Sequence, residues 1–141
     1  MHEKSMPLIL PETSSGSLAD LPGRQASANP GKVTFSVRSG SEWTDVTAAT
    51  FAADVAALAK GLMAAGIAPG EAVGIMSRTR YEWTVADFAL WSAGAVPVPI
   101  YETSSPDQVE WILADSAAVA VIVEDAAHLA AVEASRSRLP G

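Results

Sequence analysis

Three short runs of apolar residues divide the second half of the chain, and polar residues do not alternate within them. The runs occupy positions 72–76, 95–100 and 119–125. Segments of helical length follow them, at 81–94, at 106–116 and from Ala126 onward. Strands that lack polar alternation and are separated by helices are typical of a parallel sheet covered on both faces. The pattern therefore predicts an α/β fold with a parallel sheet.

A β-hairpin is expected ahead of this alternation. Its first strand has alternating apolar residues at Val33, Phe35 and Val37. We expect its turn at Arg38, Ser39 and Gly40, because glycine readily adopts a positive φ.

The helix after the hairpin has the clearest sequence signal. Its apolar stripe is formed by Phe51, Val55, Leu58 and Leu62. Thr47 is a suitable N-cap, Val46 can pack on Phe51, and Gly66 can end the helix in a left-handed conformation.

Residues 1–32 are rich in Pro, Ser and Gly and show no sustained period. This composition predicts an extended or loosely ordered segment. The regular domain is expected to cover residues 33–141.

The composition of the chain indicates which classes of binding partner are unfavourable. The 141 residues are 49% hydrophobic, which suffices for a packed core, and 9 Lys and Arg stand against 16 Asp and Glu, for a net charge of −7. Scattered basic residues in an acidic chain argue against nucleic acid as a partner. No cysteine is present, and the apolar runs are too short for a signal peptide core or a transmembrane span, so a cytoplasmic protein is expected.

The stretch "VPVPIYETSSP" at 96–106 combines an apparent strand with prolines at 97 and 99. Both missing N–H groups point to one side of the strand, which predicts that this side is partly unpaired. Ser105, Pro106 and Gln108 have the spacing of a capping box at the start of the next helix. Thr79 and Glu82 have the same spacing before the previous helix.

Ligands of open parallel sheets bind beyond the carboxyl ends of the strands. Arg78 and Arg80 at one such end could contact a phosphate or carboxylate, and Thr103, Ser104 and Ser105 at another could donate to it. These are the candidate cofactor-binding residues. Helix capping explains the hydroxyls as well, and the arginines could equally be surface charges.

Metal ligands are sparse. Glu124 and Asp125 resemble an acidic pair for Mg²⁺, but Asp125 as a helix N-cap explains the same residues. His2 and His128 are far apart, and zinc would need further carboxylates brought in by folding. We expect no metal site.

Known catalytic motifs are missing. "NPGKVT" fails as a phosphate loop, because Ala26 stands where the first glycine is needed and Val33 where Ser or Thr is needed. No GxGxxG follows a strand, and no histidine lies near a candidate serine elbow. We expect no catalytic residue in this chain.

The run from Trp43 to Asp125 resembles the amino-terminal part of the AMP-forming acyl-CoA synthetases, within the adenylate-forming superfamily. The segments "RYEW", "AGAVPVPIYETSS" and "ILADS" most resemble the long-chain fatty acid–CoA ligases. The likeness covers roughly residues 32–141, and no short piece of it is specific alone.

The resemblance implies an enzyme that couples a fatty acid to ATP and then transfers the acyl group to coenzyme A, with Mg²⁺ as a further cofactor. The family's phosphate loop, nucleotide-binding residues and carboxyl-terminal domain lie downstream of the matching region. This chain would thus be an inactive fragment, an incomplete part of a larger domain.

Two alternatives remain open: a standalone α/β module that binds a small ligand, and a non-catalytic interaction subunit. The segment from Tyr81 to Ala93 is apolar on nearly every side, and such a helix needs more cover than a small sheet provides. An exposed apolar patch and self-association are therefore expected.

Overall fold

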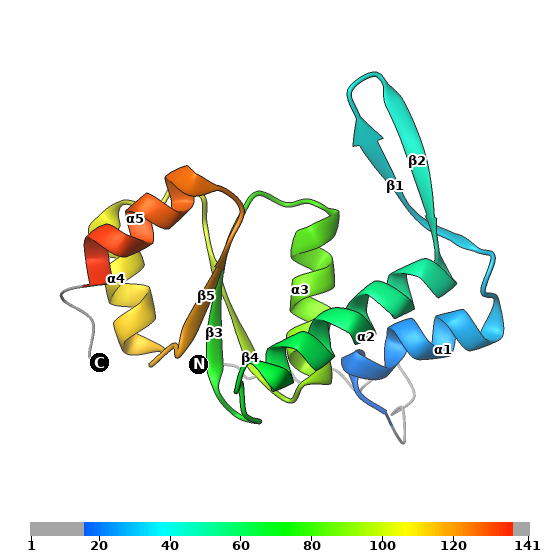
Figure 1. Ribbon diagram of the computed structural model, residues 1–141, viewed down its shortest axis with the longest axis horizontal. Coiled ribbons are helices and arrows are strands. Elements are labelled where there is room, and N and C mark those ends of the chain that lie inside the picture. The colour runs from blue at the N-terminus through cyan, green and yellow to red at the C-terminus, as the bar shows by residue number, and fades with distance from the viewer. Residues whose placement is uncertain (1–15, 137–141) are drawn as a thin grey trace, which may run out of the picture.

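The computed structural model describes residues 16–136, and Figure 1 shows the arrangement of its elements. Three parallel strands form the central sheet in the order β4-β3-β5. They are β3 (Ala72–Met76), β4 (Val96–Ile100) and β5 (Ala120–Val123). Three helices follow them: α3 (Tyr81–Ser92), α4 (Pro106–Asp115) and α5 (Ala126–Arg136). The predicted α/β fold with a parallel sheet is confirmed.

Helices cover both faces of the sheet, α4 and α5 on one side and α3 on the other (Figure 1). Met76, Ile100 and Leu113 belong to the core beneath α4, and Val73 and Leu90 to the core beneath α3. Gly74 lets α4 approach closely, because a Cβ at this position would lie 3.1 Å from Leu113 and 3.2 Å from Val121. A side chain at position 74 would require the neighbouring side chains of Leu113 and Val121 to shift.

The prolines of β4 lie on an edge strand. The Val96 N–H donates to the Glu71 carbonyl at 2.8 Å, so this residue faces β3. Pro97 and Pro99 alternate with it and face the outer side, where no described strand pairs. The predicted unpaired side of this strand is confirmed.

The hairpin consists of β1 (Val33–Ser39) and β2 (Glu42–Thr47). Ser39 pairs with Glu42, so the two turn residues are Gly40, with φ +62°, and Ser41. The turn thus lies later than expected, because Arg38 and Ser39 belong to the strand. Figure 1 shows the hairpin projecting from the body, and Phe35 anchors it at 4.9 Å from the Phe51 ring.

Helix α2 (Ala48–Ala64) begins and ends as predicted. The Thr47 hydroxyl accepts from the Thr50 N–H at 3.2 Å, and Gly66 has φ +97°. Phe51 and Val55 are buried against Val85 of α3. These contacts fix α2 against α3.

The N-terminal segment differs from expectation. Residues Leu18–Asp20 form a 3-10 helix, η1, and Leu21–Ala28 form helix α1. Ser17 and Asp20 make a reciprocal capping box, which offsets the helix-breaking composition. The expectation of an extended or loosely ordered segment is wrong for these residues, and residues 1–15 lie outside the described part.

Helix α3 has more cover than its sequence suggested, because α2, η1 and the sheet all pack against it. Ala86, Ala89 and Leu90 are buried, and Trp91 lies 5.1 Å from the Phe88 ring. The exposed aromatic residues are Trp43, Tyr101 and Trp111.

Candidate functional site at the carboxyl ends of the strands

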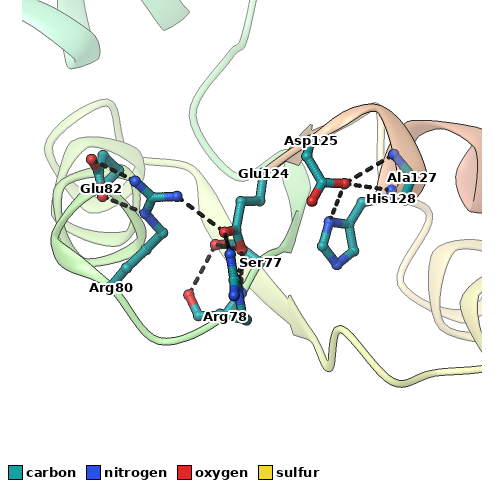
Figure 2. A network of polar contacts seen from close by, with 8 residues as sticks. All are labelled: Ser77, Arg78, Arg80, Glu82, Glu124, Asp125, Ala127 and His128. Carbon is teal, nitrogen blue, oxygen red and sulfur yellow. Dashed lines mark hydrogen bonds and ion pairs between the residues drawn. The ribbon is translucent and has the colours of Figure 1, made fainter. Parts of the chain in front are cut away.

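The loops after β3 and β5 meet at the carboxyl edge of the sheet. Figure 2 shows Arg78 and Arg80 from the first loop converging on Glu124, which follows β5. The pairing register brings these segments together, since Met76 lies beside Val123. A contact between residues 46 positions apart thus closes this edge of the sheet.

Glu124 is the centre of the network, with a side chain only 4% exposed. Its Oε2 accepts from the Arg78 backbone N–H at 2.9 Å, and its Oε1 accepts from Arg78 Nε at 3.1 Å and Arg80 Nη1 at 3.0 Å. The Ser77 hydroxyl adds a contact at 3.3 Å. Hydrogen bonds from the side chain and backbone of Arg78 hold the pKa of Glu124 far below its usual range.

Arg80 is shared between two carboxylates. It donates to Glu82 through Nε at 2.6 Å and Nη2 at 2.9 Å, and to Glu124 through Nη1. These contacts raise the pKa of the Arg80 guanidinium. The predicted capping box of Thr79 and Glu82 is wrong: Arg80 is the N-cap residue of α3, and it engages the Glu82 carboxylate instead.

The hydroxyl cluster after β4 includes a helix cap. The Gln108 N–H donates to the Ser105 hydroxyl at 3.3 Å, and the Ser105 N–H donates to Gln108 Oε1 at 2.9 Å. This reciprocal pair confirms the predicted capping box. The Ser104 N–H donates to the Tyr101 carbonyl at 3.0 Å, while the exposed Thr103 lies in the same loop.

Asp125 caps helix α5. Its Oδ1 accepts from the backbone N–H groups of Ala127 at 2.9 Å and His128 at 3.0 Å, and His128 Nδ1 lies 2.8 Å away (Figure 2). The two backbone hydrogen bonds favour the capping alternative over Mg²⁺. Within residues 16–136, no three His, Cys, Asp or Glu side chains are placed to hold a metal ion. The Mg²⁺ that the resemblance implies for the whole enzyme thus has no site built from three such side chains among the described residues, and His2 lies outside them.

An open groove of about 560 Å³ lies between β1 and the loop after β3. Its lining includes three guanidinium groups, of Arg38, Arg78 and Arg80, and also the carboxylate of Glu82, which pairs with Arg80. Tyr81 also lines it, and its hydroxyl donates to Asp54 at 2.6 Å. Burial and Asp54 raise the pKa of this phenol. The groove could receive an anionic group beside the arginines.

Sequence reasoning found the two arginines but missed their partners. From the sequence alone, Glu124 is a candidate metal ligand and Glu82 a candidate capping residue. Neither role links these carboxylates to the arginines. A carboxylate directly after a strand, beside a neighbouring strand followed by arginine, was the available signal. Arg38 carried no such signal, because its place in the groove depends on how the hairpin folds back.

A parallel sheet with helices on both faces defines an α/β protein, and ligands of such proteins bind beyond the carboxyl edge of the sheet. The model of the AMP-binding enzyme family matches residues 23–140, and the chain belongs to this family.

The long-chain-fatty-acid–CoA ligases FadD15 of Mycobacterium bovis and Mycobacterium tuberculosis are 48% and 47% identical to this chain over 98 residues. The match covers 70% of this chain and 16% of each ligase. This chain therefore spans about a sixth of the length of these relatives.

Solved structures of other proteins share this fold. A candidate long-chain-fatty-acid CoA ligase of Rhodopseudomonas palustris is 25% identical, with a TM-score of 0.80 over 91% of this chain and 31% of that one. A fatty acyl-adenylate ligase of L. pneumophila shares the fold, with 24% identity and a TM-score of 0.72 over 82% of this chain and 21% of that one. The resemblance to acyl-CoA synthetases and the fold it implies are confirmed.

No helix in the described part of the chain has the length and apolar character needed to cross a membrane.

Proposed function

We propose that this chain is the amino-terminal part of a cytoplasmic long-chain fatty acid–CoA ligase. The observation that carries the proposal is the 48% identity to FadD15 within a family match over residues 23–140. In the whole enzyme, the fatty acid carboxylate attacks the α-phosphorus of ATP and pyrophosphate leaves. The thiol of coenzyme A then attacks the acyl carbon and AMP leaves. ATP, Mg²⁺ and coenzyme A belong to that whole enzyme.

In this proposal the described residues are scaffold and the chain alone is inactive. Arg78 and Arg80 are engaged by carboxylates, and Ser105 is engaged in a helix cap. Such groups hold the strand ends in place without offering a nucleophile or a general base. No catalytic residue is assigned to the chain.

A pyrophosphate assay tests both statements. The chain is incubated with ATP, Mg²⁺, palmitate and coenzyme A, alone and after co-expression with the rest of M. tuberculosis FadD15. We expect no release above the buffer control from the chain alone and measurable release from the complex. Release by the chain alone would contradict its inactivity. A complex that is silent, or absent, would contradict the assignment to the ligase.

The groove beside Arg38, Arg78 and Arg80 favours a second candidate, a small-ligand-binding module. Pyrophosphate is a suitable anionic probe, because a guanidinium group can donate two parallel hydrogen bonds to the oxygens of one phosphate. This candidate expects saturable binding in calorimetry that Arg38→Ala weakens. Absence of binding by the wild-type chain excludes it.

Self-association is a further part of the proposal. The side chains of Trp43, Tyr101 and Trp111 are 65%, 85% and 66% exposed. They come from three elements, β2, the loop after β4 and α4, and each is a candidate contact between molecules. Sedimentation velocity over a concentration series should show a shift toward a larger species, and a concentration-independent monomer would contradict this expectation.

A further inference from the structure

Asp87 lies buried within helix α3, where a charged side chain is unusual. The residue is 8% exposed, and its carboxylate has no hydrogen-bond or ion-pair partner among residues 16–136. Among residues 16–136, His128 Nδ1 is the one fully buried side-chain nitrogen or oxygen that makes no hydrogen bond, although it lies 2.8 Å from Asp125 Oδ1. The Asp87 oxygens also make no hydrogen bond but are not fully buried, so they keep some exposure to solvent. A partner that packs over this residue would meet this small exposed surface first.

The position of Asp87 on the helix shows which side such a partner would approach. Val85 packs on α2, and a residue two positions later lies about 200° around the helix. Asp87 is thus on the side away from α2. Its neighbours one turn away are Trp83, Thr84, Leu90 and Trp91, and no hydrogen bond joins the Thr84 hydroxyl to Asp87. Trp83 and Leu90 pack toward the sheet, and Trp91 borders a hollow of about 340 Å³ beside η1.

Strand β4, at the edge of the sheet, limits the form of the partner. Pro97 and Pro99 face its outer side and lack the N–H groups that an added strand would use. Val96 beside them is 49% exposed. A partner that reached this edge of the sheet as well as α3 would contribute side chains rather than a further strand.

The chemistry of the partner follows from the carboxylate. A buried carboxylate without a donor is destabilising, whereas an arginine or lysine beside it restores the lost interaction. Glu124 shows the satisfied arrangement in this same chain, with two guanidinium groups on one carboxylate. The ion pairs of the described arginines are with Glu124, Glu82 and Glu133 and not with Asp87, so the complementary cation would come from another segment.

We propose that Asp87 binds an arginine or lysine side chain from another segment of the ligase, docked on the side of α3 that faces away from α2. The identity of this partner depends on the proposed function; the need for a cation does not. Relatives offer such a segment, because this region is 16% of the FadD15 chains and 31% of the R. palustris structure.

The first experiment co-expresses the chain with the rest of M. tuberculosis FadD15. Asp87→Asn is the test variant, and Asp115→Asn, at an exposed position, is the matched control. Exchange of fluorescently labelled chain into the complex gives the dissociation constant. We expect Asp87→Asn to weaken the complex at least about tenfold, because one partner of a buried charge pair is lost. Asp115→Asn should change it less than about twofold.

If the wild-type complex forms and releases pyrophosphate but Asp87→Asn binds equally well, the inference is overturned while the proposed function stands. If no wild-type complex forms, the proposed function fails, and a second measurement decides the inference alone. In that measurement, nuclear magnetic resonance follows the Asp87 carboxyl carbon during titration with methylguanidinium, with methylurea as the neutral control. A saturable shift with the cation alone supports the site, and no shift overturns it.

Discussion

Glu124 and Asp87 are both largely buried carboxylates, yet their surroundings are opposite. The Glu124 side chain accepts from two arginines, a backbone N–H and the Ser77 hydroxyl, and its pKa is lowered. The Asp87 carboxylate accepts no hydrogen bond from the described residues, and burial raises its pKa. The first carboxylate has its hydrogen-bond donors within the described chain. The second is the carboxylate for which we propose a cationic partner from another segment.

The largest expected effect is on Glu124. In Glu124→Gln the negative charge is lost and two guanidinium groups lose their shared partner, so the melting temperature should fall by several degrees. Differential scanning calorimetry at pH 7 measures this. Glu133→Gln is the matched control, because Glu133 is 50% exposed in its pair with Arg136. An equal shift in both variants would show that the Glu124 network is no more stabilising than a surface pair.

Arg78 and Arg80 should differ in a smaller comparison. Arg78→Ala removes three side-chain hydrogen bonds to the buried Glu124. Arg80→Ala removes one to Glu124 and two to the exposed Glu82, and it leaves Arg78 in place. We expect Arg78→Ala to lower the melting temperature more than Arg80→Ala does. If Arg80→Ala lowered the melting temperature more, the contact of Arg80 with Glu82 would contribute more to stability than the contacts of Arg78 with Glu124.

Asp87→Asn should act in the opposite direction. Removing an unpaired buried charge should stabilise the isolated chain by about 1 kcal/mol at pH 7, within the range expected for an unsatisfied polar group. Urea denaturation measures this free energy of unfolding, with Asp115→Asn as the control. A loss of stability in Asp87→Asn would indicate that the carboxylate already has a partner in the isolated chain.

The smallest effects are in the pH dependence. The lowered pKa of Glu124 stabilises the folded chain above the ordinary glutamate pKa of about 4.3, and this stability is lost as the pH falls below it. The raised pKa of Asp87 costs stability as the pH rises above the ordinary aspartate pKa of about 3.9. Melting curves between about pH 3 and pH 7 should therefore lose acid sensitivity in Glu124→Gln and gain it in Asp87→Asn. Parallel curves in all three proteins would contradict both assignments.

Local signals predicted most of the fold. Thr47 and Ser105 cap helices as their neighbours indicated, because a cap depends on residues within one turn. The strands followed from their apolar runs. The helix at Leu21–Ala28 was missed, since the weight given to Pro, Ser and Gly concealed the cap at Ser17.

The candidate site was less predictable, because it depends on distant contacts. Arg78 and Arg80 were identified from their place after a strand, but Glu124 joins them only once β3 and β5 pair. The same contacts explain the failed cap at Thr79. Asp87, a single acid among the apolar residues of its helix, was visible in the sequence and was not recognised as a signal.

The most direct test of this contrast is to titrate both carboxyl carbons in one sample by nuclear magnetic resonance, with Glu124→Gln and Asp87→Asn providing the assignments. The account predicts that Glu124 stays ionised well below the ordinary range for glutamate, while Asp87 takes up a proton above the ordinary range for aspartate. Ordinary values for both groups, or the reverse order, would contradict the assignment of one satisfied and one unsatisfied carboxylate.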